Sequence, residues 1–300
     1  MTTITVLTEN TAPESSPLVA EHGLSFFVET ARTKFIFDCG HTGAAFANAK
    51  ILGVDLRGVK FVALSHSHYD HAGGFPKLLD FAPIETIITG ENFWQEKFSR
   101  TEDGFKYRGC GFDEKFLAAR GIEQKICRDV IALDSDAWLV GDFKRRYDFE
   151  TIPEKFVKGS EKVPDNFSDG NVTLHPDVAP QLVDDSKVVA ALESRFTPDN
   201  FSDEIVLILR EVGGLAIVTA CAHSGILNIV ADVSERFNLP IVSVIGGLHL
   251  TGATQERIFR TLAELKALGV QKVLPCHCSG EDFMRNFPRR LSTGSVIEIT

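Results

Sequence analysis

The chain has 300 residues, of which 44% are hydrophobic and 24% are charged. This composition is typical of a folded globular protein, and it excludes a disordered, collagen-like or disulfide-dense chain. Acidic residues outnumber basic residues by 41 to 31, which gives a formal net charge of −10. That balance argues against a broad binding surface for nucleic acid or for an anionic membrane.

The N-terminal segment MTTITVLTENTAPESSP has neither the basic start nor the apolar stretch of a signal peptide. No segment approaches the roughly 20 consecutive apolar residues that a membrane span requires. The 6 cysteines are irregularly spaced, which does not suit a secreted disulfide framework. We therefore expect a cytoplasmic protein with reduced thiols, and the sequence specifies no oligomeric state.

The first third of the chain predicts strands that alternate with helices. Two runs rich in β-branched and aromatic residues, 23–29 and 33–38, predict a hairpin. The elements expected after it are a helix, a buried strand, a short helix and a strand, over 42–52, 59–65, 76–79 and 84–89.

The periodicity weakens at about 95–200, where polar turns and charged clusters dominate. The hexapeptide PDNFSD occurs in this part at 164–169 and again at 198–203, and we interpret the two copies as similar turns rather than as a duplication. We expect a single domain over residues 1–300 that carries this segment as an inserted cap.

Regular structure resumes after the insertion with apolar strands and amphipathic helices. The strands expected there are 205–209, 215–219, 241–245 and 270–274, and the expected helices are 226–237 and 254–268. Two further short strands, 130–133 and 137–140, are expected within the insertion. Near-continuous apolar strands indicate sheets that are covered by helices, which predicts a layered α/β architecture.

A histidine cluster follows the buried strand expected at 59–65. The sequence HSHYDH places potential metal ligands at His66, His68, Asp70 and His71. Neutral imidazoles and a carboxylate suit zinc above all, with iron or manganese as further candidates. The alternative is a solvated histidine-rich turn, but the loop is flanked by a core strand and by two glycines.

Other histidines also follow predicted strands, where loops of α/β folds assemble sites. His223 and His277 are expected to be metal ligands. His249 comes after Gly246-Gly247-Leu248, and it is either a ligand or a buried hydrogen-bond donor beside one. The sequence gives no metal role to His22 or His41.

Several segments together resemble the metallo-β-lactamase superfamily. They are GLSFFVET, FIFDCG, LSHSHYDHAGG, TACAHSGILNIV, IGGLHL and LPCHCSG, in chain order. They are most similar to the branch named for 7,8-dihydropterin-6-methyl-4-(β-D-ribofuranosyl)aminobenzene-5'-phosphate synthase. The resemblance implies an αββα four-layer sandwich with a metal centre along one edge.

The resemblance also implies a ligand set for two divalent ions. His66, His68 and His223 would hold one ion, and Asp70, His71 and His277 the other. Superfamily hydrolases with two ions usually carry a bridging aspartate after the later strand, but this sequence has Cys221 there. Cys221 is either a thiolate ligand or a small buried apolar residue, so one or two ions are expected.

Hydrolysis is the reaction that such a centre favours, because a bound ion lowers the pKa of its water to about 7. Asp70 would orient the nucleophile while it ligates or accepts its proton, and Tyr69 and His249 would donate hydrogen bonds to the substrate. The expected substrate is a small molecule with a phosphate or another ester. Arg108, Lys144 and Arg145 are candidates to bind it, unless they belong to solvated cationic loops.

Two alternatives to hydrolysis stay open. One is a methanopterin-type synthase that acts on a pterin pyrophosphate. The other is a metal-binding or redox module without hydrolytic turnover, because sulfur from Cys221, Cys276 or Cys278 could close the coordination shell. Oxygen reduction at a di-iron centre fits less well, since the bridging carboxylate is missing.

Overall fold

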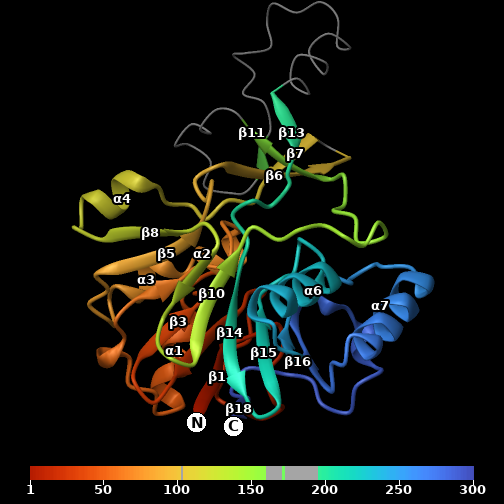
Figure 1. Cartoon of the computed structure of the whole chain (residues 1–300). Coiled ribbons are helices and arrows are strands. Elements are labelled where there is room, and N and C mark those ends of the chain that lie inside the picture. The colour runs from red at the N-terminus through yellow and green to blue at the C-terminus, as the bar shows by residue number, and fades with distance from the viewer. Residues whose placement is uncertain (103, 160–170, 173–194) are drawn as a thin grey trace, which may run out of the picture. The chain divides into compact units, whose positions relative to one another are not determined.

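A computed structural model describes residues 1–102, 104–159, 171–172 and 195–300 (Figure 1). The chain forms two compact units. The first unit comprises residues 1–93, 110–151 and 201–300, and the second comprises 94–109 and 152–200. The second unit thus lies within the interval for which the insertion is predicted, whereas residues 110–151 of that interval belong to the first unit.

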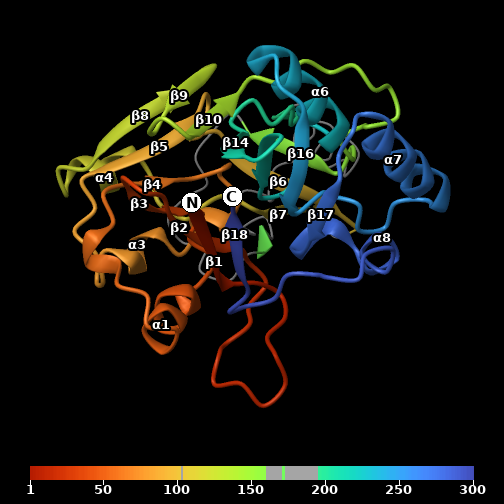
Figure 2. The same cartoon turned by 60° about the horizontal axis from the view of Figure 1, so that its bottom comes forward.

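The first unit contains a seven-stranded sheet with the strand order β18-β1-β2-β3-β4-β5-β8. Its strands are β1 (Thr2–Thr8), β2 (Ser25–Glu29), β3 (Lys34–Phe37), β4 (Val62–Ala63), β5 (Thr86–Gly90), β8 (Glu123–Cys127) and β18 (Val296–Ile299). The neighbours β3, β4, β5 and β8 are parallel, whereas β1 pairs antiparallel with both β2 and β18. The two chain ends therefore close one edge of this sheet (Figure 2).

A six-stranded sheet with the order β17-β16-β15-β14-β10-β9 packs against the first. Its strands are β9 (Val130–Ala132), β10 (Ala137–Gly141), β14 (Ile205–Glu211), β15 (Gly214–Thr219), β16 (Ile241–Gly246) and β17 (Lys272–Pro275). Because β15, β16 and β17 are parallel, their carboxyl ends meet at one edge of the sheet.

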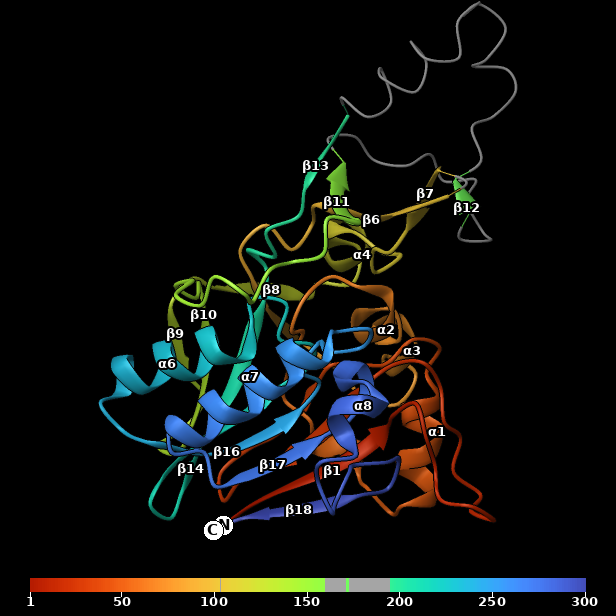
Figure 3. The same ribbon diagram turned by 90° about the vertical axis from the view of Figure 1, so that its right-hand side faces the viewer.

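Helices cover the outer faces of both sheets in the first unit (Figure 3). They are α1 (Ala44–Ile51), α2 (Tyr69–Ala72), α3 (Phe75–Leu78), α4 (Glu114–Ala118), α6 (Ile226–Phe237), α7 (Gln255–Ala267) and α8 (Glu281–Met284). Short 3-10 turns occupy Leu56–Gly58 and His277–Ser279. Among the described residues, no helix is both long and apolar enough to cross a bilayer.

Alternating side chains of β14 divide between two apolar cores. Leu207 and Leu209 lie in the core between the two sheets, whereas Val206 and Ile208 lie in the core beneath α6 and α7. This division follows the two-residue period of a strand that is buried on both faces. The layers are helix, sheet, sheet and helix, which confirms the predicted αββα sandwich.

The second unit contains a five-stranded sheet with the order β12-β7-β6-β11-β13. Its strands are β6 (Glu96–Thr101), β7 (Gly104–Tyr107), β11 (Phe156–Gly159), β12 (Asn171–Val172) and β13 (Phe196–Pro198). Lys97 Nζ lies 2.8 Å from Asp199 Oδ2 in this unit, and both side chains are 1% exposed.

Most predicted elements of the first unit are present, but one is shorter than expected, and several observed elements, among them β8, α4 and α8, were not predicted. The strand expected at 59–65 has only Val62–Ala63 in its ladder, because Ser65 N donates to the Asp38 carboxylate instead of to a strand. The strands β1 and β18 were not predicted, since the sequence reading assigned no element to either chain end. The first PDNFSD copy, at 164–169, lies outside the described residues.

Candidate metal centre

The candidate site lies in the first unit, where several strands end. The histidine cluster begins after β4 and continues into α2, whose first residue is Tyr69. His223 follows β15, His249 follows β16 and His277 follows β17. The topology thus brings loops that are far apart in sequence to one edge of the sandwich.

The structure brings the predicted ligands together at this edge. Single ligand atoms lie within 4.8 Å of one another in four groups, which are His66–Cys221–His223, His71–Cys221–His277, His22–Asp70–His277 and Cys221–His249–Cys278. The ring of His68 adjoins those of His66 and His223, with centroid distances of 4.6 and 5.1 Å. These donors are imidazole, carboxylate and thiol, which is the donor set that divalent zinc prefers.

A buried carboxylate fixes the orientation of two of the imidazoles. Asp38 Oδ2 lies 2.8 Å from His71 Nδ1 and also accepts from Ser65 Oγ at 2.7 Å. Ser65 Oγ in turn lies 2.8 Å from His66 Nδ1. A carboxylate only accepts hydrogen bonds, so His71 Nδ1 carries a proton, and the Ser65 hydroxyl, which donates to Asp38, accepts from His66 Nδ1. The Nε2 atom of each histidine therefore keeps a lone pair that can bind a metal ion.

His277 is fixed in the same way by the N-terminal segment. Its Nδ1 lies 3.0 Å from Asn10 Oδ1, and its backbone N donates to Glu9 Oε1 at 2.7 Å. His277 Nε2 therefore faces His71 Nε2 at 3.1 Å. Two nitrogen lone pairs that point at each other repel unless a cation or a proton lies between them, so the residues fit a bound metal ion.

The charges around His71 act in the same direction. Burial opposes its protonation, yet Asp70 and Asp38 raise the pKa of His71 to about 9. Burial likewise opposes ionisation of Asp70, but the neighbouring His71 and His277 hold its pKa well below the usual range. The pocket around these residues therefore stabilises positive charge at the point where the ligand atoms meet.

Glu204 and Phe201 shape the loop that carries His223. The carboxylate of Glu204 accepts from the backbone N of His223 and of Ser224, both at 2.6 Å. Burial raises the pKa of Glu204, and these two N–H groups oppose that shift. Phe201 stacks on the imidazole of His223 with a centroid distance of 3.7 Å, and burial lowers the pKa of His223 well below its usual value.

Comparisons with known proteins agree with this geometry. Residues 18–93 match the sequence model of the family described as the metallo-beta-lactamase superfamily. The chain is 27% identical, over 98% of its length and 96% of the relative, to 7,8-dihydropterin-6-methyl-4-(beta-D-ribofuranosyl)-aminobenzene-5'-phosphate synthase of Methanocaldococcus jannaschii. It is 26% identical to the solved structure of Tm1679, described as a metal-dependent hydrolase of the beta-lactamase superfamily, with a TM-score of 0.75 and 100% of both chains covered.

In part of its sequence and in its fold, the chain is similar to members of the metallo-β-lactamase superfamily. Its fold is also that of the metallo-beta-lactamase fold protein YhfI from Bacillus subtilis, with a TM-score of 0.52 at 12% identity and with 99% and 98% of the two chains covered. Folds of this superfamily usually bind divalent metals, and the His, Cys and Asp groups at the strand ends are the residues that could hold them.

Cys221 is the point at which the chain departs from the pattern that is usual in the superfamily it resembles. Its Sγ lies 3.2 Å from His71 Nε2, and it shares a group with His66 and His223 on one side and with His71 and His277 on the other. The thiol is 3% exposed. Cys221 is therefore buried, as its apolar interpretation requires, and it also belongs to candidate ligand groups on both sides.

The remaining predicted site residues lie around these groups. The ring of Tyr69 packs edge-on against His41 at 4.8 Å and lies 6.2 Å from His22. The ring of His249 lies 4.3 Å from that of His223, so His249 is close enough to act on whatever His223 binds. His22, which was given no metal role, has its Nε2 3.3 Å from Asp70 Oδ2.

The predicted basic residues are dispersed. Arg108 lies in the second unit, where its Nε donates to Ser99 Oγ at 2.9 Å. Lys144 is exposed, with its Nζ 4.0 Å from Glu235 Oε1. Glu235 lies about 14 Å along α6 from the N-terminal end of this helix, which is the end near His223. Its partner Lys144 is therefore also far from His223. Arg145 is exposed. Burial raises the pKa of Glu150, which accepts from the first turn of α6, and the charge of Arg145 is one of the smaller effects that oppose this shift.

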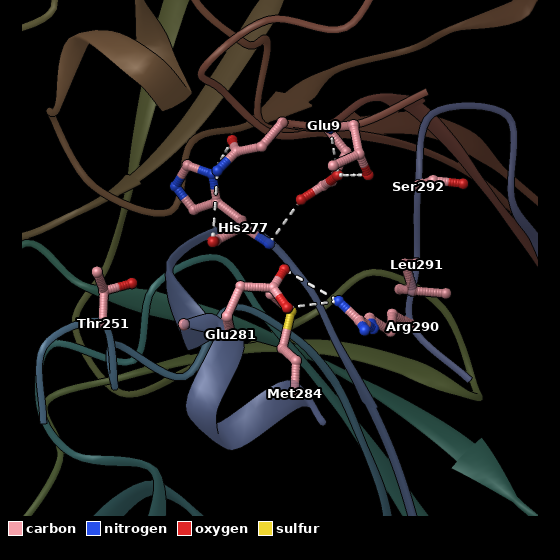
Figure 4. A pocket seen from close by; sticks show the side chains of 11 residues that line it. Glu9, Thr251, His277, Glu281, Met284, Arg290, Leu291 and Ser292 are labelled. Atoms are coloured by element: carbon pink, nitrogen blue, oxygen red, sulfur yellow. Dashed lines mark hydrogen bonds and ion pairs between the residues drawn. The ribbon is translucent and has the colours of Figure 1, made fainter. Parts of the chain in front are cut away.

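A cavity of about 430 Å³ opens beside His277 (Figure 4). Residues from the N-terminal segment, from the loop after β16 and from α8 line it, together with the segment that includes Arg290. Arg290 Nη1 pairs with both carboxylate oxygens of Glu281, at 2.9 and 2.8 Å. The sequence reading missed this arginine because nothing in its local pattern connects it with a strand end.

Proposed function

We propose that the protein is a metal-dependent hydrolase that acts on a phosphate-bearing small molecule or another small ester. The observation that carries the proposal is the convergence of imidazole nitrogens and the Asp70 carboxylate on one edge of a metallo-β-lactamase fold. We expect His66, His68 and His223 to hold one divalent ion, and Asp70, His71 and His277 the other. Zinc is the first candidate, with iron or manganese as alternatives.

Bound divalent ions supply a water of lowered pKa and a positive charge for the developing oxyanion. The residues of the chain supply orientation. Asp38 and Asn10 hold the ring protons of His71 and His277 on Nδ1, which keeps each Nε2 available. The oxygen of Asp70 that is 3.4 Å from His277 Nε2 is placed to orient an attacking water and to hold its proton.

The cavity beside His277 is the proposed binding site for the part of the substrate that does not react. Its volume of about 430 Å³ falls within the usual range for small-molecule sites. Arg290 is half-exposed and is already aligned by Glu281, so an anionic group could replace that carboxylate as its partner. We propose Arg290, rather than Lys144, as the cation that selects phosphate-bearing substrates.

The test combines metal content with a substrate screen. Protein purified without added metal should hold at least two ions per chain, and it should cleave bis(p-nitrophenyl) phosphate or a thioester in a manner that a chelator abolishes. His71→Ala should remove metal and activity, whereas the exposed His41→Ala, which belongs to none of the ligand groups, should retain both. Metal-loaded protein without turnover on any ester would overturn the hydrolase proposal.

Arg290→Gln tests the cavity separately from the chemistry. We expect it to raise KM for an anionic substrate by about 10-fold while kcat changes little, because it removes one charge-assisted contact that the substrate makes before and during reaction. Arg289→Gln is the matched control, since Arg289 donates to the carbonyl of Val296 and is not one of the residues that line the cavity. An equal effect of both variants would contradict a specific role for the cavity.

A synthase reaction is the second candidate, and the relative of 27% identity over nearly the full length favours it. In that reaction an arylamine nitrogen would displace pyrophosphate from the methyl carbon of a pterin, and the same ions would bind the leaving pyrophosphate. The two candidates differ in one measurement. Release of pyrophosphate from a pterin pyrophosphate that depends strictly on added arylamine supports the synthase, and release in water alone supports the hydrolase.

A further inference from the structure

Cys221, His249 and Cys278 form a cluster of two thiols and one imidazole beside the other histidines. Each residue comes from a different loop, after β15, β16 and β17 respectively. One ligand atom from each lies within 4.8 Å of the other two. Cys278 Sγ also accepts from the backbone N of His249 at 3.3 Å, and it lies 3.6 Å from the carbonyl oxygen of Cys221.

The backbone of these loops is built around the Cys278 sulfur. A Cβ atom on Gly247 would lie 2.7 Å from Cys278 Sγ and 2.1 Å from the carbonyl oxygen of Ala220, so only glycine allows the three loops to approach so closely. The loop after β16 is then fastened to Cys278 from the other side, because Leu250 N and Thr251 N both donate to the Cys278 carbonyl at 3.1 Å.

His249 itself adopts a left-handed backbone conformation, with φ at 51°. Residues other than glycine keep this conformation when the surrounding structure imposes it, and such residues gather at ligand sites. Here the conformation puts the backbone N of His249 on Cys278 Sγ and its ring beside His223. The loop is therefore arranged to bring a nitrogen ligand to a pair of thiols.

We propose that Cys221, His249 and Cys278 bind a cation of their own, of the borderline or soft class to which Zn²⁺ belongs. Two cysteines and one histidine make a three-ligand zinc set with one open position. The two ions of the proposed hydrolase have His66, His68, His223, Asp70, His71 and His277 as donors, and neither His249 nor Cys278 is needed for them. The Cys221 sulfur, 3.2 Å from His71 Nε2, would connect the new position to the histidine ligands.

Cobalt titration tests this site without relying on activity, because thiolate ligands give Co²⁺ a charge-transfer absorption that histidine and carboxylate ligands do not. Wild-type protein, freed of metal and kept reduced, should bind one Co²⁺ more than its histidine and carboxylate positions hold. That additional ion should carry the thiolate absorption. Cys278→Ser and His249→Ala should each weaken it by more than about 100-fold, beyond the range for loss of a neighbouring hydrogen-bond partner.

Cys276→Ala is the matched control. Cys276 is a fully buried thiol two residues from Cys278 but belongs to none of the ligand groups, so its removal should leave both the stoichiometry and the absorption unchanged. Three results would overturn the proposal. The thiolate absorption could survive Cys278→Ser at full strength, which would make Cys221 a ligand of the histidine centre alone. The second result is that the wild-type protein shows no thiolate absorption. The third is that Cys221 and Cys278 resist alkylation before reduction and react only after it, which would indicate a disulfide between them.

These outcomes are independent of hydrolysis. A variant that loses the additional ion but keeps the other two ions and the ester cleavage would leave the proposed function intact. Conversely, a protein that binds the additional ion but cleaves no ester would retain this site and refute only the hydrolase.

Discussion

Asp38→Asn is the substitution that tests most directly how the chain prepares its histidines for metal. Asp38 is fully buried and accepts hydrogen bonds from Ser65 N, Ser65 Oγ and His71 Nδ1 at 2.7, 2.7 and 2.8 Å. Its backbone has φ at 60°, a conformation that asparagine tolerates well, so the change keeps the loop and alters only the chemistry of the side chain.

The structure indicates what that change does to His71. If the asparagine keeps its oxygen toward Ser65 N, its NH₂ group faces His71 Nδ1, and a donor then meets a donor. The imidazole can respond by moving its proton to Nε2, which removes the lone pair that would bind metal. Loss of such a partner typically lowers metal affinity by 10–100-fold, or about 1.4–2.7 kcal/mol.

The assay is competition for Zn²⁺ against a chromophoric chelator of known affinity at fixed pH. Glu150→Gln is the control, since Glu150 is another buried carboxylate that accepts two backbone bonds, from Leu227 N and Asn228 N, but touches no histidine ring. We expect Glu150→Gln to lower stability and to leave zinc affinity unchanged. Wild-type affinity in Asp38→Asn, or an equal loss in both variants, would refute the reasoning.

Three further substitutions probe the frame around the site and the second unit. Glu204→Gln should lower the free energy of unfolding by about 1–3 kcal/mol in urea titrations, because a carboxylate that accepts two backbone N–H groups becomes an amide. Gly247→Ala should cost about 1–3 kcal/mol by the same measurement, since its Cβ would meet a carbonyl oxygen at 2.1 Å, whereas Gly58→Ala, whose Cβ would meet its nearest atom at 3.6 Å, should stay close to wild type. Lys97→Met should leave the Asp199 carboxylate buried without its cation and cost about 3–5 kcal/mol within the second unit, which hydrogen exchange over residues 94–102 would report as lost protection.

The candidate ligands that the structure brings together could be predicted from the sequence because their signal is local. HSHYDH occupies consecutive positions after an apolar strand, and His223 and His277 each follow a strand of their own. The supporting residues have no such signal. Asp38 is 33 residues from the histidine that it orients, and Asn10 is 267 residues from His277. Such pairs become visible only when the sheet order is known, since any buried carboxylate or amide elsewhere in the chain could have filled the same role.

The positions of His22 and of the basic residues show what a sequence pattern leaves undetermined. The sequence gives no metal role to His22, although it lies near a strand that could reach the site. In the structure, Leu24 N donates to the Asp70 carbonyl at 3.1 Å and fastens that segment against the histidine loop. Arg108 is a candidate because it precedes Gly109-Cys110-Gly111, and Lys144 because it begins a basic run after Gly141. Such local patterns do not indicate which cations share a cavity. Arg290 lies in no motif that the sequence reveals, and yet it is the arginine that lines the cavity beside His277.

The two sheets contribute different kinds of candidate metal ligand to the centre. The seven-stranded sheet and its loops contribute Asp38, Asp70 and the histidine cluster, all held in place by carboxylates or by backbone contacts. The six-stranded sheet contributes every cysteine of the centre, from loops that hydrogen-bond mainly to one another. The carboxylates thus come from the first sheet and the thiols from the second, whereas both sheets supply imidazoles, and Cys221 shares groups with histidines from both. Exchange of Cys221 for aspartate would join a third carboxylate to these groups and should shift metal preference from zinc toward iron or manganese.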